Sequence, residues 1–266
     1  MDLGLGGRSC AVTGATRGIG LAVAERLCRE DARVLLVARS DDALEEAVSR
    51  CASVGGGAHG LSLDVTASDA GEQLVAAAEE RFGALDVLVN NAGTAQRRSV
   101  EQVTDEDWNA AWELNVMAPM RAMRAAIPRM AERGWGRVVN VCSSAGKRPT
   151  VGTPDYSVAK AAELSLSRVY SEVYAKQGVL VNAICPGPVR SELWMEPGGL
   201  LDQAMESGGF GSREEALESV GAGRPIGRLA EPGEIADAIV FLCSERASYI
   251  AGSAWSVDGG SVPVII

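Results

Sequence analysis

Short apolar runs alternate with longer amphipathic stretches along almost the whole chain. The runs predict seven strands, at residues 10–13, 34–38, 60–63, 87–90, 137–142, 179–184 and 254–257. Most of them are apolar at nearly every position, which is typical of strands covered on both faces in a parallel sheet. Between the runs, apolar residues recur at helical spacing, as Ile19, Val23 and Leu27 do. The alternation predicts an α/β, doubly wound Rossmann fold with a seven-stranded parallel sheet flanked by helices.

One stretch, residues 190–224, interrupts this alternation. It contains pairs of glycines but also large apolar side chains, among them Trp194, Leu200 and Phe210. An apolar insertion with glycine hinges after a late strand predicts a lid over a substrate site. An oligomer contact or a mobile surface excursion would leave the same pattern. Because no linker, repeat or low-complexity segment divides the chain, we expect residues 1–266 to form a single domain.

Composition and charge narrow the classes of partner. The 266 residues carry 25 Lys and Arg against 35 Asp and Glu, a formal net charge of −10, and 47% of them are hydrophobic. Such an acidic chain lacks the basic face that nucleic acid or an anionic membrane surface favours, so we expect neither as a partner. No apolar run approaches the roughly 18 residues of a membrane span, and the first residues lack the pattern of a signal peptide. Six scattered cysteines without a C-x-x-C pair predict reduced thiols and a cytoplasmic location.

The chain contains a single histidine, His59. Zinc sites of the Cys₂His₂ or HExxH kind need at least two histidines, so we expect no metal site. No G-x-S-x-G sequence supplies the serine of a Ser-His-Asp hydrolase. His59 follows a glycine run and precedes an apolar stretch, which indicates a strand-edge or surface residue. If the protein is an enzyme, its proton transfers must use another side chain.

The first predicted strand leads into a glycine-rich turn, T-G-A-T-R-G-I-G at residues 13–20, and a helical pattern follows. Glycines allow the backbone to turn tightly and to approach a pyrophosphate, whose charge is favoured at the N-terminus of the helix. A glycine-rich turn can also be required for steric reasons alone. Because this turn lies between the first strand and the first helix, as a dinucleotide fingerprint does, we predict phosphate binding here.

The end of the second predicted strand indicates which dinucleotide binds. NAD-binding versions of this fold have an acidic residue there that hydrogen-bonds the ribose hydroxyls. Ala38 occupies that place, and Arg39 follows directly. Together with Arg17 in the glycine turn, Arg39 could hold a 2′-phosphate, which an aspartate would repel. Since Asp41 and Asp42 come too late and suit the start of the next helix, the sequence predicts NADP(H) in preference to NAD(H).

A tyrosine and a lysine provide candidate acid–base chemistry. Tyr156 and Lys160 are four residues apart in a helical stretch, so they share one face of the helix. An ammonium near a phenol favours the phenolate and lowers its pKa from about 10 toward the range of a working acid or base. Ser143 lies 13 residues earlier, at the end of a predicted strand. Because that edge of an open α/β sheet binds ligands, its hydroxyl is well placed to hydrogen-bond a substrate oxygen.

These elements belong to a set of six motifs that match one known family in order and approximate spacing. The motifs are T-G-x-x-x-G-x-G at 13–20, N-N-A-G at 90–93, Asn115 within L-N-V, Ser143, Y-x-x-x-K at 156–160 and Pro186-Gly187. Over nearly its whole length the chain resembles the classical short-chain dehydrogenase/reductase family. The stretches at 227–232, 247–252 and 257–260 look most like reductases of 3-oxoacyl-carrier-protein substrates.

The resemblance implies roles for individual side chains. Tyr156 would protonate the carbonyl oxygen during hydride delivery, and Ser143 would orient that oxygen, so both would contact the substrate. Lys160 would lower the pKa of Tyr156 and hold the nicotinamide ribose, while Asn115 would position a water that links Lys160 to solvent. Ser191 stands where the family usually has threonine. The expected cofactor contacts are Gly14, Thr16, Arg17, Gly18, Ile19, Gly20, Arg39, Asp64, Val65, Asn91, Ala92, Gly93, Tyr156, Lys160, Pro186, Gly187, Val189 and Ser191.

The leading functional prediction is an NADPH-dependent oxidoreductase that reduces a ketone to a secondary alcohol. The ketone would be a 3-oxoacyl thioester or another apolar or bulky ketone. Two alternatives stay open: an alcohol, steroid or sugar dehydrogenase that works oxidatively, and a non-catalytic protein that senses a dinucleotide. The second alternative would predict a damaged active site, whereas all four catalytic residues expected above are present.

Apolar helical surface predicts that the chain associates with copies of itself. The stretches at 104–133 and 154–176 offer more apolar surface than one face of a sheet covers, and the tail at 262–266 is apolar as well. The sequence therefore predicts a homo-oligomer, and the family resemblance implies a tetramer.

Overall fold

The computed structural model describes residues 2–263 of the chain. Within them, seven strands form one sheet in the order β3-β2-β1-β4-β5-β6-β7, and every neighbouring pair is parallel. The strands are β1 (Ser9–Thr13), β2 (Arg33–Ala38), β3 (Gly57–Ser62), β4 (Val87–Asn90), β5 (Gly136–Val141), β6 (Val179–Pro186) and β7 (Ala254–Val257). The predicted α/β fold with a seven-stranded parallel sheet is confirmed.

Strand β3 differs most from its expected position. It begins at Gly57, three residues before the apolar run at 60–63, and it includes His59. Unlike the central strands it is only half buried, because it lies at the edge of the sheet. An edge strand has no need of a continuous apolar run, so its first residues left no pattern in the sequence. The His59 ring lies 5.7 Å from the ring of Phe82, measured between ring centroids.

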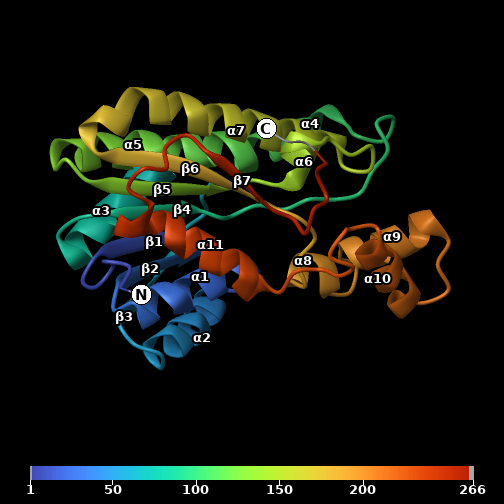
Figure 1. Ribbon diagram of the computed structural model, residues 1–266, viewed down its shortest axis with the longest axis horizontal. Helices are drawn as coiled ribbons and strands as arrows, with labels where there is room; N and C mark the ends of the chain where they lie inside the picture. Colours follow the sequence, from blue (N-terminus) through green and yellow to red (C-terminus); the bar gives the residue numbers. More distant parts are fainter. Residues whose placement is uncertain (1, 264–266) are drawn as a thin grey trace.

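Helices cover both faces of the sheet (Figure 1). One face carries α1 (Gly18–Arg29), α2 (Asp41–Ala52) and α11 (Pro232–Cys243). The other carries α3 (Ala70–Phe82), α5 (Ala118–Glu132) and α7 (Pro154–Tyr174). On β4, Val87 and Val89 pack with the first group while Leu88 packs with the second. Because successive side chains point to opposite faces, a strand covered on both sides must be apolar throughout.

The remaining elements form connections around this sandwich. They are α4 (Asp105–Trp112), the π-helical turn η1 (Glu113–Met117), α6 (Ser144–Lys147), η2 (Ala175–Gln177), α8 (Glu192–Met195), α9 (Leu200–Gly208), α10 (Arg213–Ala222) and η3 (Glu245–Ala247). The segment 190–224 thus folds into three short helices, which Figure 1 shows set apart at one end of the molecule. Among residues 2–263, no helix combines the length and the apolar character needed to cross a membrane.

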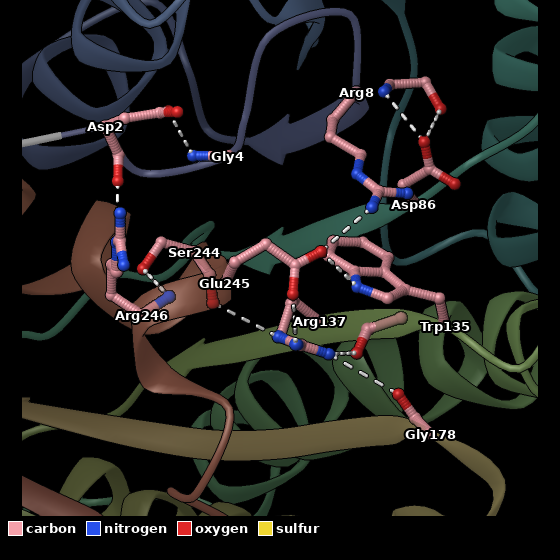
Figure 2. A network of polar contacts seen from close by, with 12 residues as sticks. Asp2, Gly4, Arg8, Asp86, Trp135, Arg137, Gly178, Ser244, Glu245 and Arg246 are labelled. Carbon is pink, nitrogen blue, oxygen red and sulfur yellow. Dashed lines mark hydrogen bonds and ion pairs between the residues drawn. The ribbon is translucent and has the colours of Figure 1, made fainter.

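A polar network joins the N-terminal segment, β5 and η3 at the start of the strands (Figure 2). Arg137 at its centre is only 4% exposed and donates to the carbonyl oxygens of Gly136 (2.9 Å) and Gly178 (3.4 Å). Glu245 accepts hydrogen bonds from the guanidinium of Arg8 (3.0 Å) and from the indole N–H of Trp135 (2.9 Å). The guanidinium groups of Arg8 and Arg137 also stack on the Trp135 ring, at 3.7 and 4.5 Å from its centroid. This network fixes the end of the sheet that lies away from the carboxyl ends of the strands.

Candidate active site

The glycine turn between β1 and α1 requires glycine at three positions. Gly14 and Gly18 have left-handed backbone angles, with φ of 63° and 55°. A Cβ atom on Gly20 would lie 2.2 Å from the carbonyl oxygen of Gly14 and 2.5 Å from Nδ2 of Asn91. The turn therefore has the close packing that a pyrophosphate site requires, and no side chain caps the first N–H groups of α1.

Asn91 holds this turn against the end of β4. Its Nδ2 donates to the carbonyl oxygens of Thr13 (2.9 Å) and Gly14 (3.1 Å). The Thr13 hydroxyl accepts hydrogen bonds from the backbone N–H groups of Asn91 and Ala92. Asn90 instead donates to Asn140 on β5 at 2.8 Å. The two asparagines thus tie β4 to its two neighbours, and Asn91 also borders the cavity described next.

A cavity of ≈ 940 Å³ opens along the carboxyl ends of the strands. It lies between β1 and β4, where the order of the strands in the sheet reverses, and open α/β sheets bind ligands at this place. All of the expected site residues border it except Gly20, which supports the turn from behind, and Asn115, which is buried. The residues that border it are Gly14, Thr16, Arg17, Gly18, Ile19, Arg39, Asp64, Val65, Asn91, Ala92, Gly93, Ser143, Tyr156, Lys160, Pro186, Gly187, Val189 and Ser191.

The two arginines expected at a 2′-phosphate both border this cavity but differ in their partners. Arg17 donates to both carboxylate oxygens of Glu196, at 3.0 and 2.9 Å, and both side chains are more than half exposed. The Arg39 guanidinium makes no hydrogen bond or ion pair with any residue from 2 to 263, and it lies near Asp64. Hydrogen bonds from Thr66 lower the pKa of Asp64, and the charge of Arg39 lowers it further. Arg39 is thus the arginine more readily available to an anion.

Tyr156 and Ser143 meet inside the cavity. Ser143 caps the short helix α6, and its oxygen accepts a hydrogen bond from the N–H of Ala145 at 3.1 Å. Its own O–H therefore remains free to donate to the phenol or to a ligand oxygen. Burial raises the pKa of Tyr156, and the Lys160 ammonium and the Ser143 hydrogen bond only partly offset this effect. The lowering of the Tyr156 pKa predicted from the sequence is therefore outweighed by burial, and Tyr156 is a phenol at neutral pH.

Lys160 is held from two sides beneath Tyr156. Its Nζ donates to the carbonyl oxygen of Val141 at 2.9 Å and to Oε2 of Glu163 at 2.7 Å. Burial alone would lower the pKa of Lys160, but the charge of Glu163 and the neighbouring Tyr156 raise it above its ordinary value. Lys160 is therefore protonated, and Nζ lies 5.8 Å from the centroid of the Tyr156 ring.

Asn115 lies in the π-helical turn η1, directly before α5. Its Nδ2 donates to the carbonyl oxygen of Ala111 at 2.9 Å, whereas its buried Oδ1 has no partner among residues 2–263. A Cβ atom on Gly93 would lie 3.1 Å from this Oδ1 and 3.7 Å from Nζ of Lys160. Because residue 93 is glycine, space remains between Oδ1 of Asn115 and Nζ of Lys160. A π-helical turn such as η1 is often found at functional sites.

Comparison with known proteins identifies this arrangement. The family model described as enoyl-(acyl carrier protein) reductase matches residues 14–261. The 3-oxoacyl-acyl-carrier-protein reductase FabG of Vibrio cholerae is 33% identical over 258 residues, which cover 97% of this chain and 98% of that protein. The chain belongs to the short-chain dehydrogenase/reductase family. It is therefore related to NAD(P)-dependent oxidoreductases over its whole matched length.

Two solved structures of this family superpose closely on the chain. L-sorbose reductase from Gluconobacter frateurii, complexed with NADPH and L-sorbose, has a TM-score of 0.93 at 36% identity, and the match covers 100% of both chains. A variant of actinorhodin polyketide ketoreductase with NADPH has a TM-score of 0.91 at 34% identity, and the match covers 97% of this chain and 98% of that one. Both are reductases by name, and both structures contain NADPH.

Sequence reasoning missed several residues of this short-chain dehydrogenase/reductase site. Glu163 lies three residues after Lys160, a spacing that places it on the same face of α7 and could have revealed it. Thr150 and Thr153 border the cavity before α7, and Arg224 borders it at the end of the segment 190–224, with no local pattern that marks them. Within residues 2–263, no group of three or more His, Cys, Asp or Glu side chains is arranged to hold a metal ion.

Proposed function

We propose that the protein is an NADPH-dependent reductase that converts a ketone into a secondary alcohol, with Tyr156 as the general acid. The observation that supports this most directly is that Tyr156 meets Ser143 and Lys160 in the same cavity as the glycine turn. The names of the L-sorbose reductase and the polyketide ketoreductase support a carbonyl substrate.

The side chains of the site suit proton donation to a carbonyl oxygen. The free O–H of Ser143 would donate to this oxygen and stabilise the negative charge that develops on it. Tyr156 would then transfer its phenolic proton to the same oxygen, and the Lys160 ammonium would stabilise the phenolate that remains. A bound NADPH would supply the hydride that the carbonyl carbon receives. The proton and the hydride together account for the two hydrogens that turn a ketone into an alcohol.

The choice of NADP(H) over NAD(H) rests on the end of β2. Arg39 follows Ala38 where an acidic residue would be expected for NAD, and its guanidinium makes no hydrogen bond or ion pair with the described residues. Arg17 borders the same cavity. The close packing at Gly20 fits a pyrophosphate at the glycine turn, and the cavity extends from this turn to Lys160.

The substrate end of the cavity indicates an apolar or bulky ketone. Leu193, Trp194 and Leu200 border the cavity from the segment 190–224, and Val151 borders it from the loop before α7. This placement supports the role of the segment as a lid. An acyl chain on a thioester and a ring ketone would both bury against such side chains, so a 3-oxoacyl thioester remains within the proposed class.

A screen of ketones with NADPH tests the function. Acetoacetyl thioesters are compared with cyclic and aromatic ketones, with wild-type protein and with Tyr156→Phe. We expect turnover of at least one class, its loss in Tyr156→Phe, and nearly unchanged NADPH binding. Tyr170→Phe, on the same helix but outside the cavity, serves as the matched control. Undiminished turnover by Tyr156→Phe would refute the assignment of the acid.

We also propose that the protein is a homo-oligomer in a reducing compartment such as the cytoplasm. Trp112 on α4 and Val158, Val169 and Val173 on α7 are between 44% and 59% exposed, so these helices present apolar surface to a partner. Residues 264–266 of the apolar tail lie outside the described residues. The family resemblance points to a tetramer, and light scattering of the native protein would measure the assembly. All six cysteines are free and buried, which supports a reducing compartment.

A further inference from the structure

The buried ion pair between Lys160 and Glu163 is a feature that the proposed reaction does not itself require. The two side chains are 3% and 2% exposed, and Nζ of the lysine is 2.7 Å from Oε2 of the glutamate. This distance is typical of a charge-assisted hydrogen bond. Burial of two charges is costly unless they are paired and hydrogen-bonded. Burial raises the pKa of Glu163, and the Lys160 ammonium acts against this rise, so the glutamate depends on the lysine to stay ionised.

The helix α7 aligns the pair with the proposed acid. Tyr156 and Lys160 are four residues apart and Lys160 and Glu163 are three apart, so all three side chains lie along one stripe of α7. Of the three N–H donors of the ammonium, one reaches Val141 and one reaches Glu163. Only one donor then remains for Tyr156 or a ligand, and its direction depends on the other two.

The neighbouring elements surround Glu163 with few other titratable groups. Two thiols lie within the electrostatic reach of the carboxylate, Cys142, which follows β5, and Cys185 on β6. Glu163 also borders a small cavity of ≈ 10 Å³. The side chains that line this cavity come from β1, β4, α3, η1, α5 and the loops between them, and apart from Glu163 none of them is titratable. Among residues 2–263, the charge of Glu163 thus acts on Lys160 and Tyr156 and, besides them, only on the two thiols.

We propose that Glu163 is a positioning residue that anchors the Lys160 ammonium and offsets its charge, so that Tyr156 keeps its proton and stays in the form that donates to a ketone. The inference rests on the proposed function, because it assigns the proton on Tyr156 to that reaction. Glu163 itself touches neither substrate nor cofactor and acts only through Lys160.

The sign of the effect follows from the charges. A carboxylate near the Lys160–Tyr156 pair makes the loss of a proton from that pair less favourable, because a further negative charge would develop beside it. In agreement, the charge of Glu163 raises the pKa of Tyr156, as burial does, and it acts against the lowering by Lys160. Removal of the carboxylate charge must therefore lower the pH at which Tyr156 ionises.

The test is a titration of the Tyr156 phenolate by ultraviolet difference absorbance in the full-length protein. Glu163→Gln removes the charge but keeps an oxygen that can accept from Lys160. Because the chain has four tyrosines, the spectrum of each protein is referenced to the same protein with Tyr156→Phe. We expect the phenolate of Glu163→Gln to form about one pH unit below that of the wild type. With a ketone substrate, the alkaline loss of reductase activity should move down by the same amount.

Matched variants separate electrostatics from structure. Glu163→Asp keeps the charge and should ionise Tyr156 within a few tenths of a pH unit of the wild type, by the same reasoning on charge. Glu172→Gln, which removes an exposed charge from the same helix, should cause no shift because solvent screens it. If Glu163→Gln does not fold, Glu163→Met offers a similar shape without the polar group.

The possible results are distinguishable. An unchanged or higher ionisation pH in Glu163→Gln overturns the inference, even if thermal stability or turnover falls, because a purely structural role would lower those alone. An equal shift in Glu172→Gln overturns it as well. The titration needs neither substrate nor turnover, so it judges Glu163 even if the ketone screen finds no activity and the proposed function fails.

Discussion

Replacement of Arg39 by alanine tests the predicted cofactor preference most directly. The guanidinium borders the cavity just after β2, and it has no ion-pair or hydrogen-bond partner among residues 2–263. Nothing else therefore has to be displaced before it can bind a 2′-phosphate. Its loss should weaken binding of NADPH and leave binding of NADH nearly unchanged, because only NADPH carries that phosphate.

The expected size of the effect follows from the type of contact and its exposure. A hydrogen bond to a charged group contributes about 1.5 to 3 kcal/mol. Since Arg39 is exposed, salt and solvent screen its charge, and the lower end of this range applies. We therefore expect Arg39→Ala to lower kcat/KM for NADPH by roughly tenfold, because each 1.4 kcal/mol corresponds to a factor of about ten.

Arg17 should contribute less, because it already has a partner. The 2′-phosphate must replace Glu196, which accepts two hydrogen bonds from Arg17. An exposed ion pair of this kind contributes about 0 to 1 kcal/mol, and its loss reduces the binding free energy that Arg17 gains from the 2′-phosphate by that amount. Arg17→Ala should therefore have a smaller effect than Arg39→Ala. Glu196→Gln should strengthen NADPH binding, by at most about fivefold.

The assay compares kcat/KM for NADPH and for NADH with one ketone, or the Kd values of the two cofactors if no ketone is yet known. Arg50→Ala is the control, since this exposed arginine on α2 pairs with Glu25 and does not border the cavity. If Arg39→Ala lowers the values for both cofactors equally, or for neither, then Arg39 does not bind the 2′-phosphate and the preference must be explained otherwise.

Two further predictions concern the glycine turn and the polar network at the far end of the sheet. In Gly20→Ala, the new Cβ would collide with the Gly14 carbonyl oxygen at 2.2 Å, so affinity for NADPH should fall at least tenfold. Gly57→Ala is the control and should bind NADPH normally, because its Cβ would make only an ordinary contact at 3.7 Å. Arg137→Met should lower the free energy of unfolding by about 1.5 to 3 kcal/mol, because it removes the charged donor to the carbonyl oxygens of Gly136 and Gly178. Chemical denaturation measures this loss, NADPH affinity should stay the same, and an unchanged stability would show that the network is dispensable.

Most of the site could be predicted because its residues follow the strands directly. Thr13 ends β1 and Asn90 ends β4, so the glycine turn and Asn91 come immediately after them. Ser143 follows β5 with one residue between, and Gly187 follows β6. In a parallel sheet all of these carboxyl ends lie along one edge, so the order of motifs in the chain already implies a shared site.

The sequence alone therefore determined the class of fold, the place of the cavity and the side chains around it, because strand periodicity and turn chemistry are local properties. Only the tertiary structure decided the partners of the charged groups. Glu196 meets Arg17 across 179 positions of the chain, and the Lys160–Glu163 pair matters because both side chains are buried together. The first contact depends on how distant segments pack, and the second on which atoms lose their water. The spacing of Lys160 and Glu163 places both on one face of α7 but does not record their burial.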